Sequence, residues 1–141
     1  MKRTHVITAA ICGAATSVAF ATAAPAAVER HPKAGHYAQM NKSGSKFKME
    51  FTLKKHKVSD AIHYDHCVVV PLLDMPKIKV KGGKFSFDGT VNDVTSNKFK
   101  VHLDGKFTSK TKAKGNWTAK KLGKDSCTSK FNYKVKRVTQ G

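Results

Sequence analysis

The segment His63–His66 carries two imidazoles and, at Asp65, a carboxylate, which are side chains that bind zinc and other transition metals. On a β-strand, residues three positions apart point to opposite faces, so chelation by both histidines would require a turn. We therefore expect His63 and His66 to be two separate surface histidines. We predict no metal site and no cofactor.

The acidic residues and the nucleophiles form no catalytic pattern. The chain has only 9 acids against 27 lysines and arginines, and no two of the acids stand out as the carboxylate pair that a glycosidase places across a cleft. There is no Gly-x-Ser-x-Gly elbow and no phosphate-cradling glycine loop that opens a helix. We predict no catalytic residues and no enzymatic activity.

Lysine dominates the charge of the chain. The formal net charge is +18 at pH 7, and it is +16 without residues 1–26, which contain two basic residues and no acid. Such a field attracts polyanions: nucleic acid, acidic polysaccharides, cell-wall polymers and anionic lipid surfaces. Exposed lysines also keep edge strands from aggregating, which is the alternative role.

Eight of these lysines lie at the polar positions of expected strands. If those strands are neighbours, the lysines form a cationic face that is a candidate polyanion-binding site: Lys46, Lys48, Lys98, Lys100, Lys106, Lys130, Lys134 and Lys136. Further lysines between residues 110 and 124 add charge along one hairpin. Binding to such a face would weaken with salt.

The elements that must position this face are predicted to be β-strands. Apolar and polar residues alternate over 47–53, 78–80, 85–87, 99–107, 113–119 and 131–135, and less regularly over 58–64, which is typical of strands with one buried face. A continuous β-branched run at 67–70 is a further strand candidate. No segment keeps a 3.6-residue apolar period.

Turn residues separate these segments at 42–44, 82–83, 88–89, 95–97 and 121–125. Connections this short favour antiparallel neighbours, because parallel crossovers need a dozen or more residues. We predict an all-β, antiparallel meander of about eight strands. A β-sandwich and an up-and-down barrel both fit this pattern.

The N-terminus resembles a secretory signal peptide over residues 1–26. A cationic start at Lys2 and Arg3 precedes an apolar, alanine-rich run from 6 to 20 and a cluster of small residues at 21–27. The small-x-small rule places cleavage after Ala26, with cleavage after Ala23 as the alternative. The apolar run is shorter than the roughly 20 residues that span a bilayer.

The mature chain is then expected to be a secreted protein with no membrane span. It would comprise a flexible lead-in at 27–35 and a single β domain at 36–141. Cys67 and Cys127 are its only cysteines, and an even pair in an exported protein predicts a disulfide, with two free buried thiols as the alternative. We expect the bridge to connect the start of a middle strand to the start of the last strand.

The order of several short motifs resembles that of a family of small secreted actinobacterial proteins. The motifs are Gly35-x-Tyr37, Gly83-Lys84-Phe85-Ser86-Phe87, Gly105-Lys106-Phe107-Thr108-Ser109, Ala113-Lys114-Gly115-Asn116-Trp117 and Cys127 followed by Phe131, together spanning about residues 35–138. The resemblance implies an exported β domain with a Cys67–Cys127 bridge, and it implies no activity. The lysine content here is higher than in the family pattern.

These observations predict an exported, non-enzymatic interaction module. Its partner would be an anionic polymer at the cell surface: cell wall, polysaccharide or nucleic acid. The alternative is a carrier that holds a small apolar ligand inside a barrel. A metal-assisted enzyme that uses His63 and His66 is the third hypothesis, and we rank it last.

Overall fold

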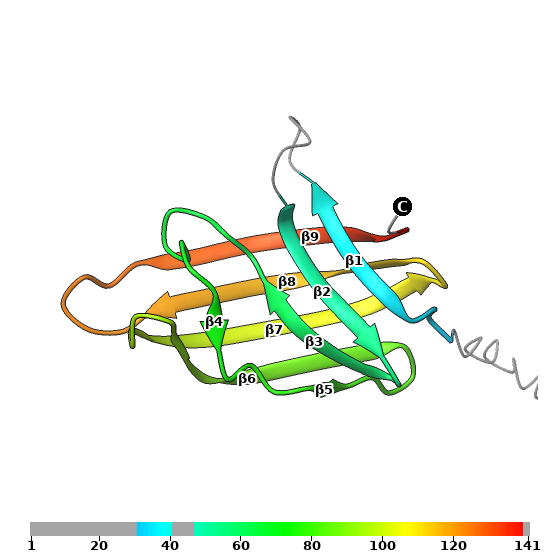
Figure 1. The fold of residues 1–141 in the computed structure, drawn as a ribbon, viewed down its shortest axis with the longest axis horizontal. Helices are drawn as coiled ribbons and strands as arrows, with labels where there is room; N and C mark the ends of the chain where they lie inside the picture. Colours follow the sequence, from blue (N-terminus) through cyan, green and yellow to red (C-terminus); the bar gives the residue numbers. More distant parts are fainter. Residues whose placement is uncertain (1–30, 41–46, 140–141) are drawn as a thin grey trace, which may run out of the picture.

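The computed structural model describes residues 31–40 and 47–139, in which nine strands form one antiparallel sheet (Figure 1). The strands are β1 (Gly35–Met40), β2 (Phe47–Lys54), β3 (Lys57–Ile62), β4 (Leu72–Leu73), β5 (Ile78–Lys79), β6 (Lys84–Asp93), β7 (Lys98–Ser109), β8 (Lys112–Lys121) and β9 (Thr128–Val138). Their order across the sheet is β4-β6-β7-β8-β9-β1-β2-β3-β5. The predicted all-β antiparallel meander is confirmed.

The sheet curls into a half-barrel, so that β1, β2 and β3 cross over β6–β9 (Figure 1). The core lies between these two parts and is built from aromatic rings. Tyr37 of β1 stacks on Phe51 of β2 at 5.3 Å between ring centroids, and its ring meets Phe107 of β7 edge-on at 5.4 Å. Phe51 also contacts Phe85 of β6 and Tyr133 of β9. These ring contacts join the two parts of the sheet.

The strands alternate as the sequence predicts. In β7, Phe99, Val101 and Leu103 are buried, whereas Lys98, Lys100 and His102 between them are exposed. This period of two places every second side chain in the core and the others in water. The polar phase of each strand therefore forms an outer face, which carries most of the lysines.

Two glycines allow the inner face to pack tightly at the middle of the meander. Gly105 and Gly115 are direct cross-strand partners, flanked in the same row by Phe85 and Tyr133. A Cβ at Gly115 would lie 1.9 Å from the carbonyl oxygen of Asp104. The Tyr133 hydroxyl crosses β8 and donates a 2.8 Å hydrogen bond to that oxygen. Burial, and then the Asp104 carboxylate, raise the pKa of Tyr133 above its ordinary value of 10.0, so the hydroxyl keeps its proton.

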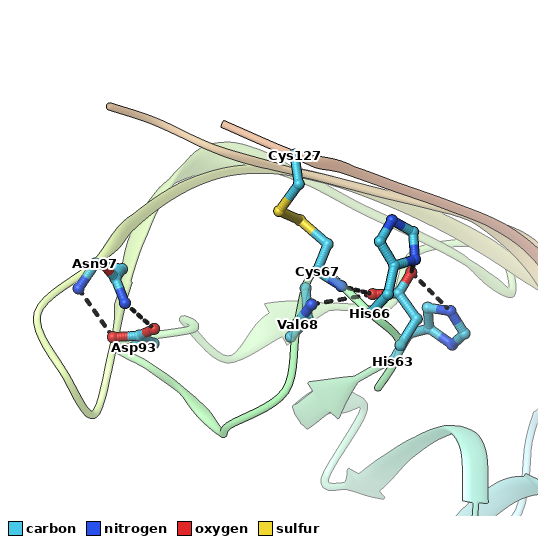
Figure 2. Close-up of a disulfide and its surroundings, with 8 residues drawn as sticks. His63, His66, Cys67, Val68, Asp93, Asn97 and Cys127 are labelled. Atoms are coloured by element: carbon cyan, nitrogen blue, oxygen red, sulfur yellow. Dashed lines mark hydrogen bonds and ion pairs between the residues drawn. A yellow bond between two sulfur atoms is a disulfide. The ribbon is translucent and has the colours of Figure 1, made fainter. Parts of the chain in front are cut away.

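Three of the expected turns are confirmed. The one at 121–125 follows the end of β8, and Gly123 within it has a positive φ of 108°. Gly82 and Gly83 both have positive φ, at 54° and 72°, and join β5 to β6 through reciprocal 2.9 Å hydrogen bonds between Lys81 and Lys84. The β6–β7 turn contains Thr95 and Asn97, whose backbone N–H groups donate to the Asp93 carboxylate at 2.8 and 2.9 Å (Figure 2 shows the Asn97 contacts). The expected turn at 42–44 lies outside the described residues.

The turn expected at Asp88-Gly89 is wrong, because both residues lie inside β6. Asp88 pairs with His102, and Gly89 pairs with Val101. The Phe87 ring covers the space above Gly89, where a Cβ would meet its Cζ atom at 2.7 Å. The strand therefore continues through Gly89. The chain turns only at residues 93–97, where the Asp93 carboxylate accepts the backbone hydrogen bonds of the turn.

The strand expected at 67–70 is also wrong, because these residues lie in the connection between β3 and β4. The Asp65 carboxylate accepts hydrogen bonds from the N–H groups of Cys67 and Val68 at 2.8 and 3.0 Å, which holds them away from a sheet ladder. Val68 is buried, whereas Val69 is 69% exposed. The β-branched composition of this run therefore does not lead to strand pairing.

The predicted disulfide is confirmed: Cys67 and Cys127 are bonded, with 5.7 Å between their Cα atoms (Figure 2). Cys127 directly precedes β9, as expected, whereas Cys67 lies in the loop after β3. The bond thus ties the β3–β4 connection to the β8–β9 connection. The predicted signal at 1–26 lies outside the described residues. Within 31–40 and 47–139, no helix has the length and apolarity needed to cross a membrane.

Candidate polyanion-binding face

A row of four lysines crosses the outer face of the meander. Lys84 of β6 pairs with Lys106 of β7, Lys106 with Lys114 of β8, and Lys114 with Lys134 of β9. All four side chains are exposed. Neighbouring strands lie about 4.8 Å apart, so the row extends roughly 14 Å across the strands. We call these four residues the lysine row.

The next row along the strands is polar and carries one charge. It consists of Ser86, Asp104, Asn116 and Asn132, again one residue from each strand. The Asn116 amide donates to both carboxylate oxygens of Asp104 at 3.2 Å. We call these four residues the amide row.

The third row contains a histidine between two carboxylates. His102 Nδ1 lies 3.0 Å from Asp88 Oδ2, and its Nε2 lies 3.4 Å from Asp104 Oδ2. The same row continues with Thr118 and Lys130. Asp88 and Asp104 thus interact with His102 and Asn116, and neither carboxylate lies within the lysine row.

An open depression of about 830 Å³ lies over the lysine and amide rows. Its walls include all four residues of each row, and β5 and the following turn add Ile78, Lys79 and Lys81. The row between them, Phe85, Gly105, Gly115 and Tyr133, completes the lining. Six lysines and one acid therefore surround a shallow hollow, which gives it a positive potential suited to anions.

The eight predicted lysines do not form one uninterrupted plate. Lys106 and Lys134 belong to the lysine row, and Lys136 lies beside it, opposite Lys112. The others are farther away: Lys98, Lys100 and Lys130 lie toward the opposite end of the strands, and Lys48 is exposed on β2, beyond β1. Lys46 lies outside the described residues.

The residues that complete the depression were not among the eight predicted lysines. Lys84 follows the turn glycines and shares the polar phase of β6, and Lys114 holds the same phase in β8. Lys79 and Lys81 come from β5 and its turn. The alternation indicates that these side chains point outward, but only the register shows that Lys84 and Lys114 lie opposite Lys106.

The expectation of two surface histidines is wrong for His63, which is 5% exposed. Its ring stacks on Phe131 with 4.2 Å between centroids and 3° between planes, and its Nδ1 donates to the Lys48 carbonyl. Its Nε2 is 3.7 Å from Asp65. The side chain of His66 is 76% exposed (Figure 2). The described residues contain no group of three or more His, Cys, Asp or Glu side chains placed to hold a metal ion.

The Asp65 carboxylate connects this histidine to the disulfide loop. Burial acts to raise the pKa of Asp65, but hydrogen bonds from the N–H groups of Val68 and Cys67 and the nearby His63 lower it by more, so the carboxyl has a pKa below its ordinary value. The group is therefore a structural acceptor that holds the loop, and it lies apart from the lysine row.

Comparisons of the chain with protein-family models, with curated proteins and with solved structures found no match.

Proposed function

We propose that this protein is an exported, non-enzymatic interaction module that binds an anionic polymer through the outer face of β6–β9. The observation that carries the proposal is the lysine row, Lys84, Lys106, Lys114 and Lys134, placed in direct cross-strand register over an open depression. Export is supported by the sequence at residues 1–26 and by the disulfide, which is typical of oxidising compartments.

The arrangement of the lysine row favours binding over mere solubility. Like charges placed directly opposite each other on neighbouring strands destabilise a sheet, on the scale of the roughly 0.2–1 kcal/mol that a favourable cross-strand pair contributes. Three such contacts follow one another here, and no acid within the row relieves them. An anionic polymer laid along the row would neutralise the repulsion and release counterions, so its binding would depend strongly on salt.

The test compares two exposed cross-strand lysine pairs, one at the centre of the lysine row and one whose side chains do not line the depression. Lys106→Gln/Lys114→Gln removes the centre of the lysine row, and Lys54→Gln/Lys57→Gln removes another exposed cross-strand lysine pair, from the β2–β3 hairpin. Both variants lose two positive charges. Each is applied to immobilised heparin and eluted with rising NaCl.

We expect the wild type and the Lys54/Lys57 variant to elute together above physiological salt, and the Lys106/Lys114 variant to elute clearly earlier. Equal elution of the two variants would mean that net charge alone causes retention. Release of the wild type at physiological salt would reject polymer binding. Circular dichroism of each variant verifies that the sheet is intact.

The interior offers no comparable support for a ligand carrier. A carrier needs an unfilled cavity between the two parts of the sheet, and the rings of Tyr37, Phe51, Phe85 and Phe107 contact one another there. We therefore base the proposal on the outer face.

A further inference from the structure

We infer that the polymer is an acidic polysaccharide, with its carboxylates on the lysine row and its hydroxyl groups on the adjacent amide row. This inference rests on the proposed function and deepens it. Three independent features of the depression distinguish a sugar chain from a nucleic acid: the width of the positive strip, the chemistry of the amide row and the absence of stacking surfaces.

The positive strip is narrow on the side of the amide row. The lysine row crosses four strands, but the next row contains the carboxylate of Asp104, and the row after it contains Asp88. Successive rows on one face lie about 7 Å apart, so a second line of phosphates laid beside the first would face these two carboxylates. On this side the strip therefore fits one line of anionic groups, with a polar flank that carries a single carboxylate. A chain of uronate sugars fits such a strip, because it carries carboxylates for the lysine row and hydroxyl groups for the amide row.

The amide row supplies hydrogen-bonding groups of both kinds. Asn116 and Asn132 are exposed and directly opposite each other on β8 and β9, and Ser86 is exposed at the β6 end of the row. A carboxamide offers a donor NH2 and an acceptor oxygen, and a hydroxyl does both as well. Asp104 accepts hydrogen bonds from hydroxyl groups, whereas its charge repels phosphate. These groups match the hydroxyls of a sugar chain.

Stacking surfaces for nucleobases are absent from this face within the described residues. The aromatic side chains of β6–β9 occupy the inner phase, where Phe85, Phe99 and Trp117 are buried. Proteins that bind single-stranded nucleic acid stack bases on exposed aromatic rings. The cations of the depression are all lysines, which lack the guanidinium fork that grips phosphate bidentately. The depression thus provides charge without base recognition.

The experiment measures the affinity of the wild type, the Asn116→Ala/Asn132→Ala variant and the Lys106→Gln/Lys114→Gln variant for three probes at one ionic strength. The probes are polygalacturonate, inorganic polyphosphate and single-stranded oligothymidylate, all of similar charge. We expect the wild type to bind polygalacturonate tightest. The asparagine variant should weaken that binding roughly tenfold, equivalent to about 1.4 kcal/mol, and leave polyphosphate binding unchanged. The lysine variant should weaken binding to all three probes.

Different results would overturn the polysaccharide inference and the proposed function. Tighter binding of polyphosphate or oligothymidylate than of polygalacturonate, or an asparagine variant that leaves polygalacturonate binding unchanged or weakens all probes equally, overturns the polysaccharide inference but leaves polymer binding in place. Binding that is insensitive to the lysine variant with every probe overturns the proposed function itself. The replaced side chains are exposed, and the fluorescence of the buried Trp117 verifies that each variant is folded.

Discussion

Replacing Gly115 with alanine is the sharpest test of the packing beneath the lysine row. The new Cβ would lie 1.9 Å from the Asp104 carbonyl oxygen and 2.7 Å from the Gly105 Cα atom. Both contacts are with the backbone of the neighbouring strand, which cannot rotate away as a side chain can. The β7–β8 pair must therefore separate locally, at the centre of the meander.

The size of the effect follows from two contributions. Forcing one extra carbon into a packed site costs about 1–3 kcal/mol, and contact with backbone places this case toward the upper end. The same Cβ would lie 2.6 Å from the Tyr133 hydroxyl oxygen, so it also disrupts that group's hydrogen bond to Asp104, worth about 1 kcal/mol. We expect Gly115→Ala to lower the free energy of unfolding by about 3 kcal/mol, a large share of the roughly 5–15 kcal/mol of a typical domain.

Urea unfolding followed by tryptophan fluorescence measures this loss directly. Trp117 is the only tryptophan of the chain and is 1% exposed, so unfolding transfers its indole from the core to water. Tyr133→Phe, which removes only the hydrogen bond, should cost about 1 kcal/mol. Gly82→Asn should be nearly neutral, because nothing lies within 4 Å of a Cβ there and asparagine tolerates positive φ. A loss below about 1 kcal/mol for Gly115→Ala would refute the close approach of the strands.

Three further predictions concern the loop, the β6–β7 turn and the lysine row. Replacing Cys67 and Cys127 with alanine removes a link between residues 60 apart and should cost about 4 kcal/mol in urea unfolding; an unchanged midpoint would contradict this. Burial raises the pKa of Asp93, but the hydrogen bonds from Asn97 and Thr95 lower it by more. The ionised carboxylate therefore stabilises the fold above about pH 4, and this stabilisation is lost as the pH falls through the pKa of the folded state. Asp93→Asn should therefore be less stable than the wild type at pH 7, with the two converging in acid; a constant gap across the pH range would refute this. Lys106→Gln and Lys114→Gln should each raise the melting temperature slightly at low salt, and the gain should vanish in about 1 M NaCl.

The alternation of side chains allowed much of the fold to be predicted. In β7 every second residue from Phe99 to Phe107 is apolar or glycine, and each of them is buried. Such a pattern determines which side chains point inward, because the period of a strand is two. It does not determine which residue of the next strand lies opposite. The pattern therefore predicts that Lys84 and Lys114 point outward, whereas their alignment with Lys106 depends on the register, which pairing between strands distant in sequence sets.

Each wrong prediction has a cause that the local composition does not indicate. The run at 67–70 has the composition of a strand, but the Asp65 carboxylate binds the backbone N–H groups that a ladder would need. Asp88-Gly89 has the composition of a turn, but Phe87 covers the glycine and pairing with β7 continues. His63 looked exposed in a polar segment, yet stacking on Phe131 of β9 buries it. In each case one tertiary or side-chain contact outweighs local propensity.

The lysine row affects the stability of the fold and the affinity for the polymer in opposite directions. Each like-charge contact weakens the free sheet, so neutralising Lys106 or Lys114 should strengthen the fold while it weakens the complex. A ligand that binds only the folded state stabilises it in proportion to the logarithm of its concentration over Kd, so the polymer would raise the melting temperature most in the wild type. If lysines serve solubility alone, neutralising them strengthens the fold without weakening the binding of a polymer. Lys54 and Lys57 form a cross-strand lysine pair outside the depression, so this pair provides the measure of that purely structural behaviour.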